Sequence, residues 1–409
     1  MSSSCAPEFG GGWNFYTLVM SSRVNSNSKE SRIKQLDVLR GIAILLVLGH
    51  HSFSIPASIL QIPLAGFLIG TYQSVGWAGV DLFFVLSGFL VSGLVFTEFK
   101  QSLSFDLKRF LIRRGFKIYP AYYFFSVVGW ITIPWILIDL RNYWRPILCE
   151  LCFVQNYGSS IWAHTWSMAV EEHFYFLCGC LLLFLSRQKY AFTVIPKIGL
   201  VLGIGACAWR FATCLNGAWN YHYLYYTHLR LDSLFAGVVL SYLYHCQRAW
   251  LDRIASGRVK LMLVASAILV SPCAFFGIRG LWTFSVGLTC LYLGFTLLLL
   301  SSLYGSIPPK GFAIGILSWI GYFSYSIYLW HQPVFAVVGI LAIFIHDPIV
   351  RFCTQTALYV SLSFLTGFLM ARWIERPFLK LRDRIYPSRS PKLRMELHEN
   401  KGILDECST

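Results

Sequence analysis

Residues that can do acid–base chemistry occur in an apolar stretch near the start of the chain. Asp37, Arg40 and His51 lie within 36–51, where most other residues are aliphatic. An ionisable group at the centre of a bilayer costs about 2.5–3.5 kcal/mol, so such groups are kept where they face a polar interior. Arg40 and His51 are eleven residues apart. This is about three helical turns, so a helix presents both on one stripe beside Asp37. The spacing predicts an imidazole base near mid-membrane; His50 points about 100° away.

A pair of adjacent carboxylates, Glu171 and Glu172, falls inside a later apolar segment. Two carboxylates inside a span must be paired or hydrated, because desolvation of an unpaired charge is costly. Their side chains diverge by about 100°, so one faces the interior while the other braces a neighbouring helix. A carboxylate that meets His51 would raise its basicity and fix its tautomer. His164 and His173 are interpreted as interfacial or packing residues.

Three cations, Arg113, Arg114 and Lys117, precede another apolar segment. Arg114 and Lys117 are three residues apart and share one face of a helix. Two interpretations stay open for this basic group. It binds lipid phosphate, or it holds the phosphates of a soluble substrate, because arginine offers a bidentate fork to phosphate.

Five further residues carry polar groups that could belong to a site. Asp81 is either an interfacial cap or part of a site. Arg230 and Asp232 form either a self-neutralising pair or part of a polar cavity, and Trp166 opens the segment with the two glutamates. His331 stands two residues before Pro333, where we predict a broken helix of the kind that lines sites in membrane proteins.

Two short motifs are assigned to structure rather than to chemistry. Ser87-Gly88 is typical of close helix packing. Cys149 and Cys152 have the spacing of a metal or redox motif without a second pair, so we expect no metal site.

Composition places these residues in a membrane protein. The chain has 409 residues, a mean hydropathy of +0.58, 56% hydrophobic and 13% charged residues, which a soluble globule does not show. Ten apolar segments are predicted as membrane-spanning helices, so the fold class is all-α and polytopic. They lie near 37–55, 77–97, 118–138, 166–186, 194–212, 225–246, 260–277, 281–300, 317–344 and 351–374.

The net charge of +15 is explained by orientation rather than by nucleic acid. With both termini cytoplasmic, most of the 34 Lys and Arg fall on the cytoplasmic side, where they also meet anionic lipid. We expect residues 1–35 to be a disordered or loosely attached cytoplasmic tail. Residues 36–380 form the ten-helix membrane domain, and 381–409 form a basic cytoplasmic tail.

Taken together, the motifs resemble those of the acyltransferase type 3 family of integral membrane proteins. The likeness covers about residues 33–380. The segments that carry it, in the family's order, are 36–41 with His51, 79–90, 113–120, 166–175, 230–237, 324–333 and 375–378.

The resemblance implies a ten-helix enzyme of the cytoplasmic membrane of bacteria. Such an enzyme takes an acyl group from cytoplasmic acyl-CoA, with acetyl-CoA the expected donor and no bound cofactor. It passes the group to a hydroxyl of a sugar in a surface polysaccharide or glycolipid. Some members carry an appended extracytoplasmic hydrolase-like domain, which is not seen in this sequence, so we expect the membrane part or a separate protein to complete the transfer.

The family pattern also implies residue roles. His51, rather than His50, matches the essential histidine, as general base or transient acyl carrier. Arg40 matches its partner, and Glu172 with Glu171 the acidic pair. Arg114 and Lys117 fall on an Arg-x-x-Arg-like motif, where Lys117 keeps the charge but loses a bidentate donor.

The remaining expectations concern the two substrates and the alternatives. Arg113, Arg114 and Lys117 would hold the donor's phosphates. The acceptor would lie near the set Asp81, Trp166, Arg230, Asp232 and His331. Two alternatives stay open: acylation of a small hydroxylated metabolite, and a non-enzymatic transporter or flippase whose buried charges relay protons.

Overall fold

The computed structural model describes residues 34–132, 143–188, 192–217, 220–277, 280–307 and 310–387. Within these ranges the chain forms helices, turns and loops, and no strand. The chain divides into two units, Met1–Ile33 and Lys34–Thr409, and the following concerns the second. The tail expected at 1–35 falls almost wholly outside the described residues, as do residues 388–409.

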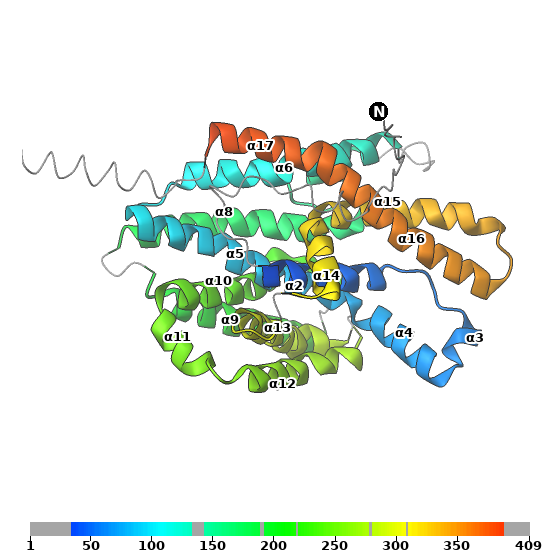
Figure 1. Ribbon diagram of the computed structural model, residues 1–409, viewed down its shortest axis with the longest axis horizontal. Helices are drawn as coiled ribbons and strands as arrows, with labels where there is room; N and C mark the ends of the chain where they lie inside the picture. Colours follow the sequence, from blue (N-terminus) through cyan, green and yellow to red (C-terminus); the bar gives the residue numbers. More distant parts are fainter. Residues whose placement is uncertain are drawn as a thin grey trace, which may run out of the picture. The chain divides into compact units, whose positions relative to one another are not determined.

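The helices follow one another through the unit, as Figure 1 shows. Their bounds in chain order are α2 (Lys34–His50), α3 (Ala57–Leu60), α4 (Pro63–Val75), α5 (Gly79–Ser102), α6 (Leu107–Thr132), α7 (Trp144–Leu151), α8 (Trp166–Ser186), α9 (Ile195–Leu215), α10 (Leu231–Cys246), α11 (Arg248–Ala255), α12 (Val259–Val270), α13 (Leu288–Leu303), α14 (Phe312–Tyr322), α15 (Ser324–Leu341), α16 (Pro348–Met370) and α17 (Arg376–Ile385). A 3₁₀ turn precedes α8 at Ala163–Thr165, and π-helical turns lie at Thr283–Gly287 and Ala371–Glu375.

Each of the ten predicted segments overlaps a helix, but ten crossings are not confirmed. Six helical stretches in the described part of the chain are long and apolar enough to cross a membrane, or seven if the bent pair α11 and α12 counts as one span. Helix α2 has 17 residues, about 25 Å at 1.5 Å per residue, and α10 and α14 are also short. The cations at the start of α6 lower its hydropathy.

The ninth predicted span is two helices, and its break was placed wrongly. Helix α14 ends at Tyr322 and α15 begins at Ser324, so the chain breaks at Phe323. Helix α15 then continues through Pro333 to Leu341. A hydrogen bond from His164, outside the helix, satisfies the carbonyl that Pro333 leaves without a donor.

Glycines allow the closest helix contacts. A Cβ on Gly88 of α5 would lie 1.9 Å from the carbonyl oxygen of Leu234 in α10, and one on Gly237 would lie 2.1 Å from that of Val85. Backbones this close leave no room for a side chain, as the Ser87-Gly88 motif predicted. Helices α2 and α14 meet in the same way, through Gly41 and Gly321.

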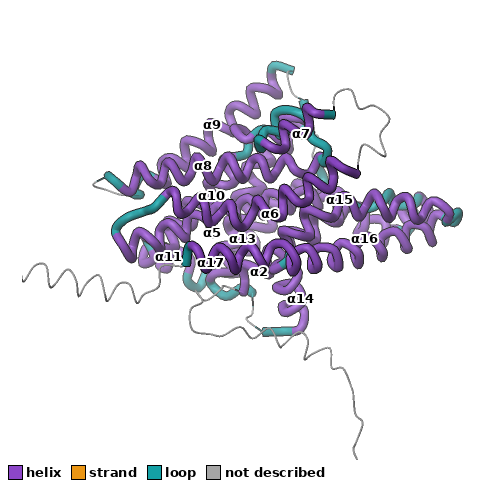
Figure 2. Tube along the Cα trace, turned by 90° about the horizontal axis from the view of Figure 1, so that it is seen from above, coloured by secondary structure: helices purple, strands orange, loops and turns teal. Residues whose placement is uncertain are grey.

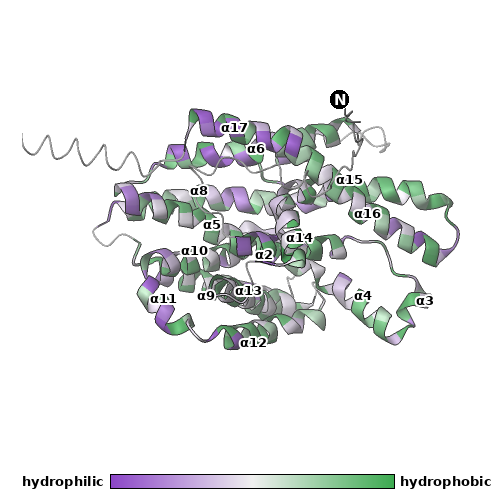
Figure 3. Cartoon of the chain, in the orientation of Figure 1, coloured by the Kyte–Doolittle hydropathy of each residue, from purple (hydrophilic) through white to green (hydrophobic). Residues whose placement is uncertain are grey.

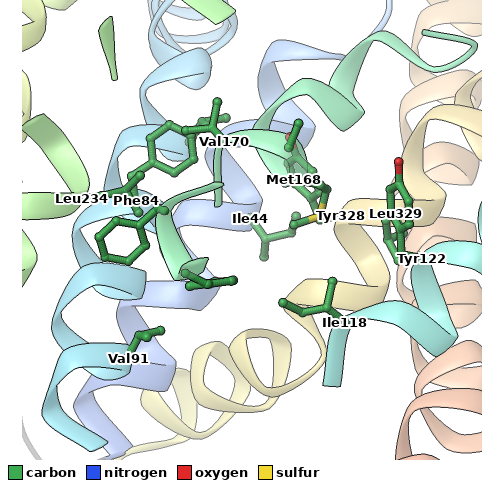
Figure 4. Packing of buried hydrophobic residues seen from close by; sticks show 14 of the residues in the cluster. Ile44, Phe84, Val91, Ile118, Tyr122, Met168, Val170, Leu234, Tyr328 and Leu329 are labelled. Atoms are coloured by element: carbon green, nitrogen blue, oxygen red, sulfur yellow. The ribbon is translucent and has the colours of Figure 1, made fainter. Parts of the chain in front are cut away.

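Helix α2 lies at the centre of these contacts. It packs against α4, α5, α13, α14 and α15, and Figure 2 gives a second view of this arrangement. Figure 4 shows Ile44 of α2 among apolar side chains of neighbouring helices, including Phe84 of α5 and Tyr328 of α15. The apolar stretch that carries Arg40 and His51 is therefore surrounded by other helices.

Helix α17 differs in character from the rest. It contacts α6, beside which it runs in Figure 1. Figure 3 shows many hydrophilic residues along it, whereas α12 is mostly hydrophobic. It also crosses residue 380, where the membrane domain was expected to end.

Candidate active site

His51 stands immediately after the last residue of α2. Its backbone N–H still reaches the Val47 carbonyl oxygen at 3.2 Å, so the residue keeps a helical position. Its ring atom Nδ1 lies 3.1 Å from the same oxygen. A carbonyl oxygen only accepts hydrogen bonds, so the contact assigns the proton to Nδ1 and leaves a lone pair on Nε2. His51 therefore presents the basic nitrogen of a neutral imidazole.

A second imidazole lies against this one. His331 of α15 is fully buried, and its ring centroid is 5.0 Å from that of His51. Its Nδ1 donates to the Tyr328 carbonyl oxygen at 2.6 Å. Its Nε2 is buried and has no hydrogen-bond partner among the described residues. This ring too holds an unused lone pair.

A third imidazole, His164, explains why α15 does not break. Pro333 has no N–H, so the carbonyl of Leu329, four residues earlier, loses its helical donor. His164 Nε2 lies 3.2 Å from that oxygen and donates to it. The freed carbonyl is thus satisfied from outside α15. The expectation that His164 only packs misses this contact, because the sequence shows the orphan carbonyl but not its donor.

His51, His164 and His331 form what we call the histidine cluster. The rings of His164 and His331 are 4.9 Å apart. Tyr328 supports the cluster, because its hydroxyl donates to the His164 carbonyl oxygen at 2.8 Å and lies 2.6 Å from Ser167 Oγ. No group of three or more His, Cys, Asp or Glu side chains in the described part of the chain is arranged to hold a metal ion.

Glu171 is surrounded by donors from other elements. It accepts hydrogen bonds from Ser87 Oγ at 2.8 Å and from the Tyr175 hydroxyl at 2.5 Å. The guanidinium of Arg114 lies over the Tyr175 ring, 5.4 Å from its centroid. The positive charges of Arg114 and Arg40 both act on this carboxylate. Arg40 also lies 3.8 Å from Asp37 at the start of α2.

Glu172 points to a different neighbour. Its carboxylate accepts a hydrogen bond from the Tyr119 hydroxyl of α6. The ring of His51 contacts the Val47 carbonyl, His50 and His331, and no carboxylate of the described residues is among its hydrogen-bond partners. The acidic partner expected for His51 is thus not hydrogen-bonded to it among the described residues.

Arg230 and Asp232 do not neutralise each other. Arg230 pairs with Asp81 of α5 at 2.8 Å, and both are buried. Its guanidinium also lies 5.6 Å from the ring centroid of Trp166. Asp232 pairs instead with Arg210 of α9 at 2.8 Å. The two residues face different neighbours because they are two positions apart on the chain, where one helical turn cannot bring them together.

Arg210 has no surface exposure, and the sequence analysis did not select it. Besides Asp232 it donates to the Leu229 carbonyl oxygen at 2.7 Å and to Thr289 Oγ1 at 2.8 Å. Arg210 is an arginine inside the predicted apolar segment 194–212, and this feature of the sequence could have identified it as a candidate.

The basic group lies inside α6. Arg113 of this group contacts α17 and the residue that follows it. Arg113 donates to the Tyr386 carbonyl oxygen and lies 3.6 Å from Asp383. Arg109 donates in the same way to the carbonyl of Pro387. These contacts attach α17 to α6.

The chain belongs to the acyltransferase 3 family. Residues 33–372 match the family described as an acyltransferase domain. This range includes the histidine cluster, Glu171 and both buried ion pairs.

Curated relatives carry names of the same kind. The chain is 27% identical over 369 residues to the peptidoglycan O-acetyltransferase OatA of Listeria monocytogenes, covering 85% of this chain and 56% of that protein. It is 28% identical over 381 residues to a putative O-acetyltransferase of Staphylococcus aureus, covering 85% of this chain and 57% of that one. The chain therefore spans little more than half the length of these relatives. No solved structure matches it.

Proposed function

We propose that this protein is a membrane O-acyltransferase that moves an acyl group, first of all acetyl, from acyl-CoA to a hydroxyl of a sugar. Its family and the names of its relatives support the reaction class. One observation carries the proposal. His51 presents an unprotonated Nε2 beside a second buried imidazole, where acid–base chemistry needs a neutral base.

The reaction follows from that nitrogen. The acceptor hydroxyl attacks the thioester carbonyl, its proton passes to Nε2 of His51, and the carbon–sulfur bond breaks as the carbon–oxygen bond forms. The same proton then goes to the departing coenzyme sulfur. A positioned base of this kind contributes typically about 10²–10⁴-fold in rate. The contact of Nδ1 with the Val47 carbonyl keeps the ring oriented throughout.

We assign the substrates to opposite sides of His51. The donor approaches from the side of Arg113, Arg114 and Lys117, which the charge bias makes cytoplasmic. The acceptor approaches near Asp81, Arg230 and Trp166, which lie in contact with one another. A surface polysaccharide or glycolipid is the acceptor that this arrangement suits, in a bacterial cytoplasmic membrane with both termini inside.

Reporter fusions test the orientation. Fusions within 98–117 and after residue 401 are expected to report the cytoplasm, and one within 216–222 the opposite side. The reverse pattern would overturn the assignment of donor and acceptor sides.

Transfer itself is tested with purified protein in liposomes, labelled acetyl-CoA and cell-wall or lipid-linked glycans as acceptors. The parent protein is expected to label an acceptor, and His51→Ala to lower the rate at least about 100-fold. His50→Ala is the matched control, since its ring is tied to the Gln73 carbonyl oxygen of α4 at 3.2 Å. Absence of labelling by the parent protein with every glycan class would contradict the proposal.

A further inference from the structure

A basic groove lies where α16 leads into α17. It has a volume of about 360 Å³ and is lined by Arg372, Arg376, Pro377 and Lys380. The three cations follow one another at intervals of four residues, which places them along one side of a helix. The wider π-helical turn Ala371–Glu375 lies within this run, and such turns occur frequently at functional sites.

The acid within this run is engaged elsewhere. Glu375 accepts a hydrogen bond from Ser326 Oγ of α15 at 3.1 Å. Among the described residues, Arg372, Arg376 and Lys380 form no ion pair with an acid. On the same helix Arg382 lies 2.8 Å from Asp383. The groove therefore collects positive charge that the described protein does not neutralise.

Arg376 is held in place by aromatic rings. Its guanidinium lies 5.4 Å from the ring centroid of Tyr322 and 5.3 Å from that of Phe323. Its Nε is buried and lacks a hydrogen-bond partner among the described residues. A buried donor left unsatisfied costs about 1–3 kcal/mol, so an acceptor from outside the described residues is favoured there. Arg372 and Lys380 are exposed and free to close on such a ligand.

The cations of α6 are less available for that role. Arg113 already contacts Asp383 of α17 and the carbonyl of Tyr386, which follows that helix. Arg114 lies over the Tyr175 ring beside Glu171. Phosphate recognition needs donors that are not already committed, and guanidinium groups with open forks suit it best.

We propose that the groove lined by Arg372, Arg376 and Lys380 binds a phosphate group. Two sources carry this chemistry. One is coenzyme A, with its diphosphate and ribose phosphate, and that arm rests on the proposed function. The other is the headgroup of an anionic phospholipid at the membrane surface. Binding, rather than transfer, is the readout, so failure of the transfer reaction leaves the lipid arm intact.

The test uses the full chain in nanodiscs, with Arg372→Gln and Lys380→Gln made singly. Both residues are exposed, so the fold is retained. Arg384→Gln is the matched control, because it removes the same charge from an exposed position of α17 that does not line the groove. One arm titrates coenzyme A in neutral phosphatidylcholine nanodiscs at low and high salt. The other counts phosphatidylglycerol retained by the protein from mixed nanodiscs, by mass spectrometry.

If coenzyme A is the source, each groove variant raises its Kd about tenfold at low salt, and less at high salt, because such contacts are screened. If phospholipid is the source, the coenzyme Kd stays constant and retained phosphatidylglycerol falls. In both cases Arg384→Gln behaves as the parent protein does. Unchanged binding in both arms, or equal losses in Arg384→Gln, would overturn the proposal.

Discussion

The ion pair of Arg210 with Asp232 and the histidine cluster are both polar and buried, but they satisfy their hydrogen bonds differently. Arg210 donates to a carboxylate, a carbonyl and a hydroxyl, each within 2.8 Å. In the histidine cluster, each of the three rings donates one hydrogen bond from a ring nitrogen to a backbone carbonyl oxygen. Two of the remaining nitrogens, Nδ1 of His164 and Nε2 of His331, are buried and have no hydrogen-bond partner in the part of the chain that the structure describes. Saturated groups hold helices together, whereas an unused lone pair is free for chemistry.

The Asp81–Arg230 pair is intermediate between these regions. Its two charges are 2.8 Å apart, yet Asp81 Oδ2 and Arg230 Nε have no hydrogen-bond partner among the described residues. The ion pair thus attaches Arg230 to α5. It also leaves one acceptor atom and one donor atom near Trp166 that can still form hydrogen bonds. This is why we place the acceptor there rather than at Arg210.

The largest effect on stability is expected where the hydrogen bonds are complete. Arg210→Met leaves Asp232 buried and uncompensated, which costs about 3–5 kcal/mol. Thermal unfolding of the detergent-solubilised protein measures the loss. The double change Arg210→Met with Asp232→Leu is expected to recover much of it, because no buried charge remains. A single variant as stable as the parent would show that this ion pair is dispensable.

A smaller loss of transfer and stability is expected when Glu171 is replaced, and a still smaller one when Glu172 is replaced. Glu171→Gln weakens acceptor contacts with Ser87 and Tyr175 and removes the charge that faces Arg114. Hydrogen bonds to a charged group are worth about 1.5–3 kcal/mol, so transfer and stability both fall. Glu172→Gln is the matched control and is expected to cost less, since Tyr119 is its hydrogen-bond partner. The measurement is the transfer rate of each variant, normalised to the amount of folded protein. A larger loss in Glu172→Gln than in Glu171→Gln would contradict this prediction.

The helix contact that carries Asp81 and Asp232 is tested through its glycines. Gly88→Ala would place a Cβ 1.9 Å from the Leu234 carbonyl oxygen, so α5 and α10 must separate at a cost of about 1–3 kcal/mol. Gly205→Ala in α9 meets nothing within 4 Å and is expected to leave stability unchanged or slightly higher. The midpoints of thermal unfolding compare them, and equal midpoints would contradict the close contact.

The smallest effect is expected at the support of the histidine cluster. Tyr328→Phe removes hydrogen bonds to the His164 carbonyl and to Ser167, worth about 1 kcal/mol each. The fold should survive while kcat falls several-fold with KM little changed, because His164 and His331 lose their positions. A change confined to KM would assign Tyr328 to substrate binding instead.

The sequence predicted the elements better than their partners. Residues 166–186 coincide with α8, and the close packing at Gly88 follows from a local motif. Contacts between residues far apart in the chain could not be predicted from the sequence. The Leu329 carbonyl freed by Pro333 is visible in the sequence, but its donor His164 is more than 160 residues away. Likewise, Arg230 and Asp232 look like partners along the chain, yet each pairs with a residue of another helix.

The positions of helix ends are the other respect in which the structure differs from the sequence-based prediction. Ten apolar segments can be recognised, but hydropathy does not fix where a helix breaks, and α14 and α15 separate at Phe323 without a proline. The choice between Glu171 and Glu172 also depends on how α8 is rotated against α5 and α6. That rotation is set by packing, which a single sequence does not specify.

Chemical rescue tests the central claim most directly. His51→Ala removes the base and leaves a space the size of an imidazole, so free imidazole added to the transfer assay can take its place. We expect His51→Ala to lose transfer and to regain part of it as imidazole increases, while His50→Ala keeps a near-parental rate that imidazole does not alter. Transfer retained by His51→Ala and lost by His50→Ala would contradict the assignment of Nε2 of His51 as the catalytic base.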